Sequence, residues 1–281
     1  MSLENLSKWN LKKQLIKSHI LSRLFGVYYN SKFNNLKAYC FFLGTQRNGL
    51  TILSSLLNAH PNILLSHELS VFEYIKYGFT KEQIYTLILL RDKYFGKKRE
   101  RKGSGYDYNV PGQWQGYYDN VRIIGDKQPG KSARFIDADP ELLSQLKELT
   151  GLPVRVIQHV RNPYDNISTI CRKKKEPIEK TIDRYFSRQK QALSVTKLLD
   201  TNELIVTRHE ELIEDPEKCI NKVLNFLDLP IDNNYILACT SKVFKEQKIT
   251  RTSVNWTAES IEKVKKEIDK YPFLTGYSYE I

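Results

Sequence analysis

The stretch "AYCFFLGTQRNGLTILSSLLNAH" (residues 38–60) contains the pattern that decides the fold. An apolar run with high β propensity leads through a short loop, which contains Gly44 and Gly49, into an apolar helical pattern. Glycine permits tight turns, and the free N–H groups at the start of a helix attract an anion. The loop matches the phosphate-loop pattern G-x-x-x-x-G-K-[ST], except that Leu50 stands in place of the lysine. The stretch therefore predicts a phosphate-binding turn, and an ordinary strand–turn–helix corner is the alternative.

The same alternation of strand and helix patterns continues along the chain. Further short apolar runs, at 62–66, 121–126, 153–160 and 203–208, are separated by helical patterns, notably at 164–174, 178–199 and 216–227. Strands that are apolar on both faces and alternate with helices predict a parallel sheet that is covered on both sides. We therefore predict a three-layer α/β fold, with a central parallel sheet flanked by helices. In such a fold, ligands bind beyond the carboxyl ends of the strands.

Two segments stand apart from this alternation. Residues 1–37 predict a basic helical segment, which we expect to pack on the domain; docking to a membrane or a partner is the alternative. Residues 38–281 contain no linker rich in proline, glycine or serine and predict a single α/β domain. An insertion at about 70–120 contains a stretch rich in glycine and aromatic residues (103–120). We expect the insertion to cover a substrate, and simple packing of its aromatic side chains is an equal alternative.

The chain of 281 residues is strongly basic, with 44 lysines and arginines against 32 acidic residues and a formal charge of +12. This excess favours an anionic ligand such as a phosphorylated small molecule, nucleic acid or acidic lipid. The four cysteines lack C-x-x-C spacing, so we expect reduced thiols and no metal site. No apolar run is long enough to cross a membrane, and the N-terminus is too polar for a signal peptide, so we expect a cytoplasmic protein.

Arg47 and Thr51 supply polar side chains to the predicted phosphate loop, because a guanidinium binds terminal anionic groups through paired hydrogen bonds and a hydroxyl adds another donor. Residues 45–68, "TQRNGLTILSSLLNAHPNILLSHE", resemble the phosphosulfate-binding region of sulfotransferases that use 3′-phosphoadenosine 5′-phosphosulfate (PAPS). In that family a basic residue precedes Ser-Gly-Thr-Thr and the P-loop lysine is absent; Asn48 and Leu50 depart from this pattern. The resemblance implies that the nucleotide contacts Thr45, Gln46, Arg47, Asn48, Gly49, Leu50 and Thr51.

A second signature follows the strand pattern at 153–160. The sequence "RNPYDNIST" (161–169) resembles the family segment that grips the 3′-phosphate with an arginine at the strand end and a hydroxyl group on the next helix. The resemblance implies that Arg161 binds this phosphate together with Ser168 or Thr169. A salt bridge is the alternative for the arginine.

Two later segments also resemble the family. The stretch "VTRHEELIEDPEK" (206–218) resembles a family segment whose role is structural. Residues 248–279 resemble the family's C-terminal region, in which a basic loop folds over the nucleotide. This resemblance implies a phosphate contact for Arg251, with solvent exposure as an equal alternative, while we expect Trp256 to pack in the protein rather than to stack on adenine.

Sulfuryl transfer needs a base that takes the proton of the acceptor. The sequence places His67 and Glu68 directly after the second strand pattern, and Glu68 matches the catalytic glutamate of tyrosylprotein-type sulfotransferases. The resemblance implies that Glu68 is the base, His67 the reserve and Glu73 a third candidate. The alternatives are a salt bridge between Glu68 and an arginine of the loop, and a structural role for His67.

The stretch "GDKQPG" (125–130) follows the third strand pattern and resembles the Asp-Lys-x-Pro of sulfotransferases. We expect Lys127 to stabilise the bridging oxygen or to orient the acceptor, since a compact ammonium suits a point charge; a surface lysine is the alternative. Asp126 either orients Lys127 or caps a turn. We expect His159, within an apolar run, to be a core residue.

These patterns favour an enzyme that transfers a sulfuryl group from PAPS to a hydroxyl group, or an amine, of an acceptor such as a glycan, a lipid or a small metabolite, without a metal. The alternative is a P-loop kinase or hydrolase that uses ATP and magnesium; Leu50 argues against it, and Asp126 is its one candidate metal ligand. A third hypothesis, a non-enzymatic binder of nucleic acid or membrane, rests on charge alone, because the basic residues are spread along the chain. The sequence specifies neither the acceptor nor the oligomeric state.

Overall fold

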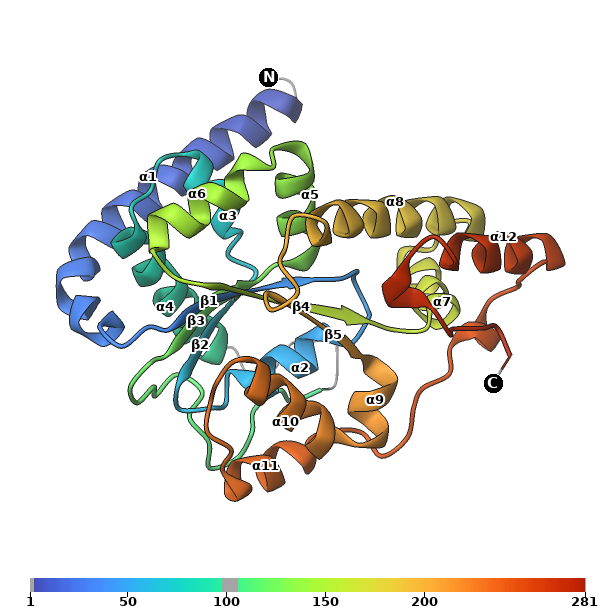
Figure 1. Cartoon of the computed structure of the whole chain (residues 1–281). Helices are drawn as coiled ribbons and strands as arrows, with labels where there is room; N and C mark the ends of the chain where they lie inside the picture. Colours follow the sequence, from blue (N-terminus) through green and yellow to red (C-terminus); the bar gives the residue numbers. More distant parts are fainter. Residues whose placement is uncertain (1–2, 98–105, 281) are drawn as a thin grey trace.

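The computed structural model describes residues 3–97 and 106–280. Within them, five parallel strands form one sheet in the order β2-β3-β1-β4-β5, with helices on both faces (Figure 1). The strands are β1 (Ala38–Leu43), β2 (Ile63–His67), β3 (Ile123–Lys127), β4 (Val154–Val160) and β5 (Leu204–Arg208). Each strand overlaps one of the apolar runs in the sequence, and β2 and β3 extend one residue beyond the expected ends at 66 and 126. The predicted three-layer α/β fold is therefore confirmed.

The helices precede the first strand, lie between the strands and follow the last strand. They are α1 (Leu3–Tyr29), α2 (Leu50–Leu57), α3 (Val71–Lys76), α4 (Lys81–Lys97), α5 (Pro129–Ala138), α6 (Glu141–Thr150), α7 (Pro163–Lys174), α8 (Ile178–Thr196), α9 (His209–Glu214), α10 (Pro216–Phe226), α11 (Asn233–Thr240) and α12 (Ala258–Ile268). In Figure 1, helices α3, α5 and α6 lie above the sheet, and α2, α10 and α11 lie below it.

Strand β1 explains why the sheet is buried on both faces. Its side chains alternate, because successive residues of a strand point to opposite faces. Phe41 and Leu43 belong to the apolar core with α3 to α6, and Cys40 and Phe42 belong to the core with α2, α10 and α11. All four are at most 1% exposed, and each large apolar side chain contributes about 1.5–3 kcal/mol on burial.

The N-terminal segment forms a long helix, α1, followed by a 3₁₀ helix (Asn30–Phe33). The side chains of Ser18 and Ser22 on α1 are buried, and Ser18 Oγ lies 3.2 Å from the hydroxyl oxygen of Tyr74 in α3. No helix among the described residues combines the length and the apolar character needed to cross a bilayer.

The insertion at about 70–120 contains two helices, α3 and α4, before the glycine- and aromatic-rich stretch. Of that stretch, 103–105 lie outside the described residues. Tyr106 donates to the carbonyl oxygen of Lys242 (2.5 Å), and its ring lies 5.0 Å from that of Phe244. Trp114 and Tyr117 are exposed, 40% and 73% respectively. The aromatic residues of the insertion thus divide between contacts within the protein and the surface.

Candidate active site at the carboxyl edge of the sheet

The carboxyl ends of β1, β2, β3 and β4 bring four loops to one edge of the sheet. Ligands of parallel α/β sheets bind at this edge. The site residues expected from the sequence lie in these loops, in the helices that follow them, or in the segment around Arg251 that comes later in the chain, except that His67 and Lys127 are the last residues of β2 and β3.

Asn48 fixes the shape of the predicted phosphate loop. It is 2% exposed, donates from Nδ2 to the carbonyl oxygen of His159 (2.5 Å) and accepts at Oδ1 from the backbone N–H of Leu50 (3.1 Å). Short side-chain turns of this kind hold a backbone conformation without a helix or strand. The departure of Asn48 from the sulfotransferase pattern thus has a structural reason.

Asn166 of α7 ties the same loop to the neighbouring strand–helix unit. Its Oδ1 accepts from the hydroxyl of buried Thr45, and its Nδ2 donates to the carbonyl oxygen of Gln46 (2.8 Å). Asn166 is fully buried. We did not identify it from the sequence, because its partners precede it by more than 100 residues and no local pattern marks the contact.

Gly49 is required by a close approach as well as by its backbone angle. Its φ is +92°, and a Cβ atom there would lie 2.2 Å from Nδ1 of His209, the first residue of α9. Burial and then the charge of Arg161 lower the pKa of His209 to about 4, so its imidazole is neutral at pH 7. His209 is a second residue that we missed, and its partner became visible only in the tertiary structure.

Lys127, Glu68 and Thr51 meet at the other side of this loop. Nζ of Lys127 lies 3.1 Å from Oε1 of Glu68 and 3.4 Å from Oγ1 of Thr51 at the start of α2. The lysine side chain is 4% exposed, whereas the glutamate side chain is 44% exposed. Lys127 is therefore not a surface lysine, and the basic partner of Glu68 is this lysine rather than an arginine of the loop.

Asp126 holds the turn that presents Glu68. Its carboxylate is 2% exposed and accepts from the hydroxyl of Ser66 (2.8 Å) and from the backbone N–H groups of Leu69 (3.0 Å), Ser70 (2.8 Å) and Val71 (3.2 Å). Burial raises the pKa of Asp126, and these hydrogen bonds act in the opposite direction. Of its two expected roles, Asp126 therefore caps a turn, and both its oxygens are occupied by donors from the protein.

The cost of forming this turn explains the need for Asp126. Glu68 and Ser70 have positive φ angles, +59° and +71°, which residues with a Cβ atom rarely adopt. We expect Asp126→Asn to lower the free energy of unfolding by about 2–3 kcal/mol, because an amide replaces an acceptor of charge-assisted bonds. Chemical denaturation measures this loss. Asp119→Asn, the same change at an exposed position, is the control and should change stability by less than about 0.5 kcal/mol.

The two reserve candidates for the base lie elsewhere. The ring of His67 packs against Phe95 of α4, with centroids 3.9 Å apart, and the residue is 7% exposed. Glu73 of α3 forms an ion pair with Lys131 of α5 (3.7 Å). His159, as expected, is fully buried; its Nδ1 lies 2.9 Å from the hydroxyl of Thr207.

Arg161 lies on the opposite flank of the phosphate loop. It is 7% exposed and donates to the carbonyl oxygens of Arg47 (3.3 Å) and Lys248 (2.7 Å), while the side chain of Arg47 is exposed. Burial lowers the pKa of Arg161 from its usual value, and the nearby carboxylates of Asp165 and Glu210 act in the opposite direction. The two arginines that the sequence singled out therefore belong to adjoining loops of one edge.

The hydroxyl groups expected beside Arg161 differ in their surroundings. Ser168 is fully buried and accepts from the indole N–H of Trp256 (3.0 Å). Thr169 is half-buried, and its Oγ1 lies 3.0 Å from Oγ1 of Thr250, which is itself 3.5 Å from Nη2 of Arg161. The unforeseen Thr250 thus lies beside this arginine with Thr169 next to it, and Trp256 packs in the protein.

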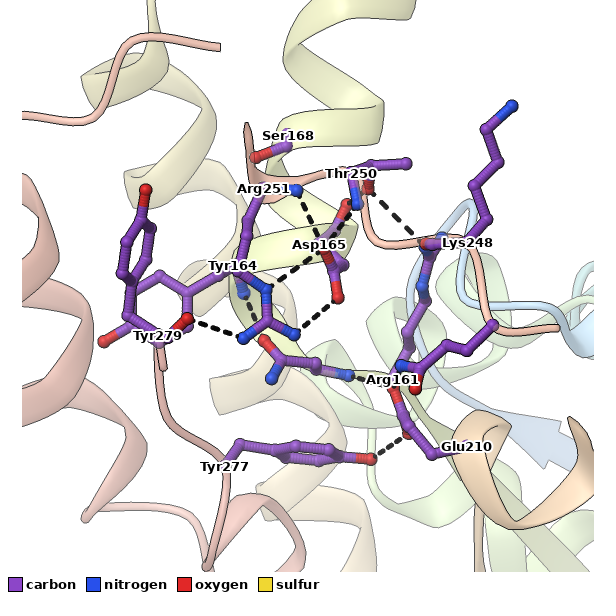
Figure 2. A network of polar contacts seen from close by, with 12 residues as sticks. Arg161, Tyr164, Asp165, Ser168, Glu210, Lys248, Thr250, Arg251, Tyr277 and Tyr279 are labelled. Atoms are coloured by element: carbon purple, nitrogen blue, oxygen red, sulfur yellow. Dashed lines mark hydrogen bonds and ion pairs between the residues drawn. The ribbon is translucent and has the colours of Figure 1, made fainter. Parts of the chain in front are cut away.

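Arg251 is buried in an ion pair with Asp165 of α7 (Figure 2). Nη2 of Arg251 lies 2.8 Å from Oδ2 of Asp165, and Nη1 donates to the carbonyl oxygens of Ser278, Tyr279 and Glu280 at 2.9, 2.7 and 3.1 Å. The alternative of solvent exposure is wrong, because Arg251 is 5% exposed. A phosphate contact from this guanidinium would require some of these bonds to break.

The Asp165–Arg251 pair should be a major source of stability. Burial would raise the pKa of Asp165, but the bonds from Arg251 and Thr250 outweigh it, so the pKa lies below its usual value. We expect Asp165→Asn to cost about 3–5 kcal/mol in free energy of unfolding at pH 7, because it leaves a buried guanidinium uncompensated. The wild-type protein should lose this contribution as the pH falls below about 4, where the carboxylate takes up a proton.

Urea unfolding at pH 7 and at lower pH values measures both effects. Asp183→Asn is the matched control, since Asp183 forms an exposed ion pair with Lys263. The side chain of Asp183 is 66% exposed and that of Lys263 is 45% exposed. That change should alter stability by no more than about 1 kcal/mol. Equal losses of unfolding free energy in the two variants would show that the buried pair stabilises the protein no more than the exposed pair.

Among the described residues, no group of three or more histidine, cysteine, aspartate or glutamate side chains could hold a metal ion. This edge of the sheet carries three groups of residues. The phosphate-loop turn lies in the middle, the Lys127–Glu68 pair lies on one flank, and buried Arg161 with two threonines lies on the other. These are the parts that a nucleotide-dependent transferase needs to hold an anionic donor and to deprotonate an acceptor.

A profile of the sulfotransferase family matches residues 40–233. This match covers more than half of the chain and includes the phosphate loop, the Lys127–Glu68 pair and Arg161. The chain therefore belongs to the sulfotransferase family, and it is a transferase of the kind that generally uses PAPS as the donor. No curated protein matches the sequence significantly.

Solved structures share the fold at low sequence identity. The sulfotransferase domain of the olefin synthase of Synechococcus PCC 7002 is similar with a TM-score of 0.54 and 17% identity, over 84% of this chain and 94% of that one. Sulfotransferase STF1 of Mycobacterium tuberculosis H37Rv gives a TM-score of 0.51 and 14% identity, over 90% and 82% of the two chains. Sulfotransferase STF9 of Mycobacterium avium gives a TM-score of 0.51 and 12% identity, over 90% of this chain and 81% of that one.

Proposed function

We propose that this protein transfers the sulfuryl group of PAPS to a hydroxyl group, or an amine, of an acceptor, with Glu68 as the base. The observation that carries the proposal is the Lys127–Glu68–Thr51 cluster. It lies at the start of α2, on the same side of the sheet edge as the phosphate loop. PAPS supplies the sulfuryl group and a leaving group, 3′-phosphoadenosine 5′-phosphate.

The residues of the cluster match the charges that develop during the transfer. As the acceptor oxygen forms its bond to sulfur, the bond from sulfur to the 5′-phosphate oxygen breaks and that oxygen gains negative charge. We assign the ammonium of Lys127 to stabilise this charge, and the carboxylate of Glu68 to take the acceptor proton; their distance of 3.1 Å supports this assignment. The exposure of Glu68 and the burial of Lys127 fit these roles, because the acceptor must reach the base.

The binding of the donor divides between the two flanks of the loop. We assign the 5′-phosphosulfate to the loop of residues 45–51 and the side chain of Arg47, and the 3′-phosphate to Arg161 with Thr169 and Thr250. We leave Ser168 out of this assignment, because its buried hydroxyl oxygen accepts a hydrogen bond from the indole of Trp256.

A cavity between α2, α4 and the insertion is our candidate site for the acceptor. It is lined by residues of α2, α4 and the insertion, including Ser55, Asp92, Phe95 and Tyr108. Ser55 lies one helical turn after Thr51, and Phe95 contacts His67, the neighbour of Glu68. Asp92 is 3% exposed and accepts from the side chain of Asn58 (2.6 Å). A carboxylate in the cavity suits an acceptor that carries hydrogen-bond donors.

Thermal unfolding with 3′-phosphoadenosine 5′-phosphate against ATP plus magnesium tests the donor. A ligand that binds the folded state alone, at 100 times its Kd, adds about 2.7 kcal/mol to stability. We expect the bisphosphate to raise Tm and ATP plus magnesium to have little effect. The reverse preference would favour a P-loop kinase or hydrolase.

We expect Arg47→Ala to weaken the binding of the bisphosphate about tenfold or more while leaving the Tm of the free protein unchanged. The side chain of Arg47 is exposed, so its loss costs little stability, whereas a charge-assisted bond to phosphate contributes about 1.5–3 kcal/mol. Arg172→Ala, at an exposed position of α7, is the control and should bind normally. Calorimetric titration gives both affinities, and equal affinities in the two variants would contradict the assignment of Arg47.

A further inference from the structure

Helix α1 packs on the protein through small side chains together with Leu15 and Tyr29, and it presents other large apolar side chains to the outside. Ser18 and Ser22 are buried, 8% and 1% exposed, and a Cβ atom at Gly26 would lie 3.6 Å from Oγ1 of Thr86 in α4. Small residues at i, i+4 and i+8 let two helices approach closely. The buried side of α1 therefore combines these small residues with Leu15 and Tyr29, which pack against the apolar core.

The opposite side of α1 carries an exposed apolar row. Ile16, Ile20, Leu24 and Tyr28 follow one another at intervals of one helical turn and are 53%, 54%, 70% and 75% exposed. Phe25 lies beside them at 40%. Figure 1 shows α1 at the outer edge of the molecule, beside α4. Single exposed apolar residues are ordinary on protein surfaces, but a contiguous row indicates an interaction site.

Apart from Glu4 near its start, the charged residues of α1 are all basic. From residue 5 to its end the helix contains Lys8, Lys12, Lys13, Lys17 and Arg23 and no acidic residue. Lys13 and Lys17 line a shallow hollow on this surface together with Ile16, Ile20 and Leu21. A partner of this face must therefore offer both apolar contact and negative charge.

We propose that α1 docks parallel to the surface of an anionic lipid bilayer, with the row from Ile16 to Tyr28 in the boundary of the acyl chains. Amphipathic basic helices bind in this way, since lysine and arginine reach the headgroups while the apolar side chains enter the boundary. Each basic residue near an anionic surface adds to the attraction. Tyr28 and Phe25 add aromatic rings of the kind found at membrane interfaces.

A second copy of the chain fits this face less well. Pairing two α1 helices through the same row would bring lysines of both copies together, and the helix has no acidic residue beyond Glu4 to compensate them. Anionic headgroups supply the missing charge. The inference does not depend on the sulfotransferase chemistry, because it concerns a surface that the catalytic proposal does not use.

Co-sedimentation with vesicles tests the proposal. Wild-type protein is mixed with vesicles of phosphatidylcholine alone or with one third phosphatidylserine, at low and high salt. We expect binding to the anionic vesicles only, reduced at least tenfold by high salt. The variant Ile16→Ser, Ile20→Ser, Leu24→Ser should lose binding at least tenfold, and Lys13→Gln, Lys17→Gln, Arg23→Gln should do the same.

Matched controls separate this face from general hydrophobicity and charge. Leu198→Ser, Ile231→Ser, Leu237→Ser removes exposed apolar residues of other elements, and Arg172→Gln, Lys173→Gln, Lys174→Gln removes the same three charges from α7. Both controls should bind vesicles like the wild type. Circular dichroism and thermal unfolding verify that every variant is folded.

Three results would overturn the proposal. The first is the absence of wild-type binding to anionic vesicles, and the second is equal binding by the α1 variants and their controls. The third is a dimer in sedimentation velocity that the apolar α1 variant abolishes while vesicle binding is absent, because the face would then belong to a second copy. Selective capture of an acidic protein without vesicle binding would likewise replace the lipid.

Discussion

Replacing Glu68 by glutamine should lower kcat by a factor of about 10²–10⁴ while leaving the affinity for 3′-phosphoadenosine 5′-phosphate within about twofold of the wild type. Glutamine keeps the size of the side chain but cannot take a proton from the acceptor. The nucleotide should bind normally, because its proposed ligands are in the phosphate loop and around Arg161. The measurement combines steady-state turnover with labelled PAPS and calorimetric titration of the bisphosphate.

Glu73→Gln is the matched control for this experiment. Glu73 is one of the two other candidates for the base, and it pairs with Lys131 of α5 rather than with Lys127. We expect this variant to retain most of its turnover. If Glu68→Gln turned over normally and Glu73→Gln were inactive, the assignment of the base would move to Glu73, and the turn capped by Asp126 would have no catalytic purpose.

Lys127→Met should lower kcat by about 10²–10³, with a smaller change in KM for PAPS. Methionine fills a similar space, so the buried position at the end of β3 stays occupied while the ammonium beside Thr51 and Glu68 is lost. A group that acts mainly on the charge of the leaving oxygen affects the transition state more than the bound donor.

The control for Lys127 is Lys131→Met, since the side chain of Lys131 is 45% exposed in its ion pair with Glu73. That variant should keep wild-type kcat. A rise in KM with unchanged kcat in Lys127→Met would mean that the lysine binds the donor in its ground state and does not stabilise the transferred charge.

The sequence was sufficient for the sheet and for the general position of the site. Each strand is a short apolar run between helical patterns. Strands of a parallel sheet that is buried on both faces have this composition, so the sequence alone indicates them. Glu68, Lys127 and Arg161 were found because each lies at the end of a strand or directly after it, and the carboxyl ends of parallel strands converge at one edge.

The roles of individual polar residues were less accessible. Arg251 looked like a basic residue of a loop over the nucleotide, but it pairs with Asp165 and binds three carbonyl groups near the end of the chain. Nothing local distinguishes a buried arginine from one that faces a ligand. The same holds for Ser168, which is one residue from Thr169 but turns toward Trp256.

Strand order along the chain, the phosphate-loop turn and the residues at the strand ends thus follow from local sequence, because strand, turn and helix propensities act over a few residues. The pairing of Glu68 with Lys127, the fit of Gly49 against His209 and the outward apolar row of α1 depend on contacts between distant segments. Only the packed fold brings such segments together, and burial in that fold decides which charged groups meet each other and which remain open to a ligand.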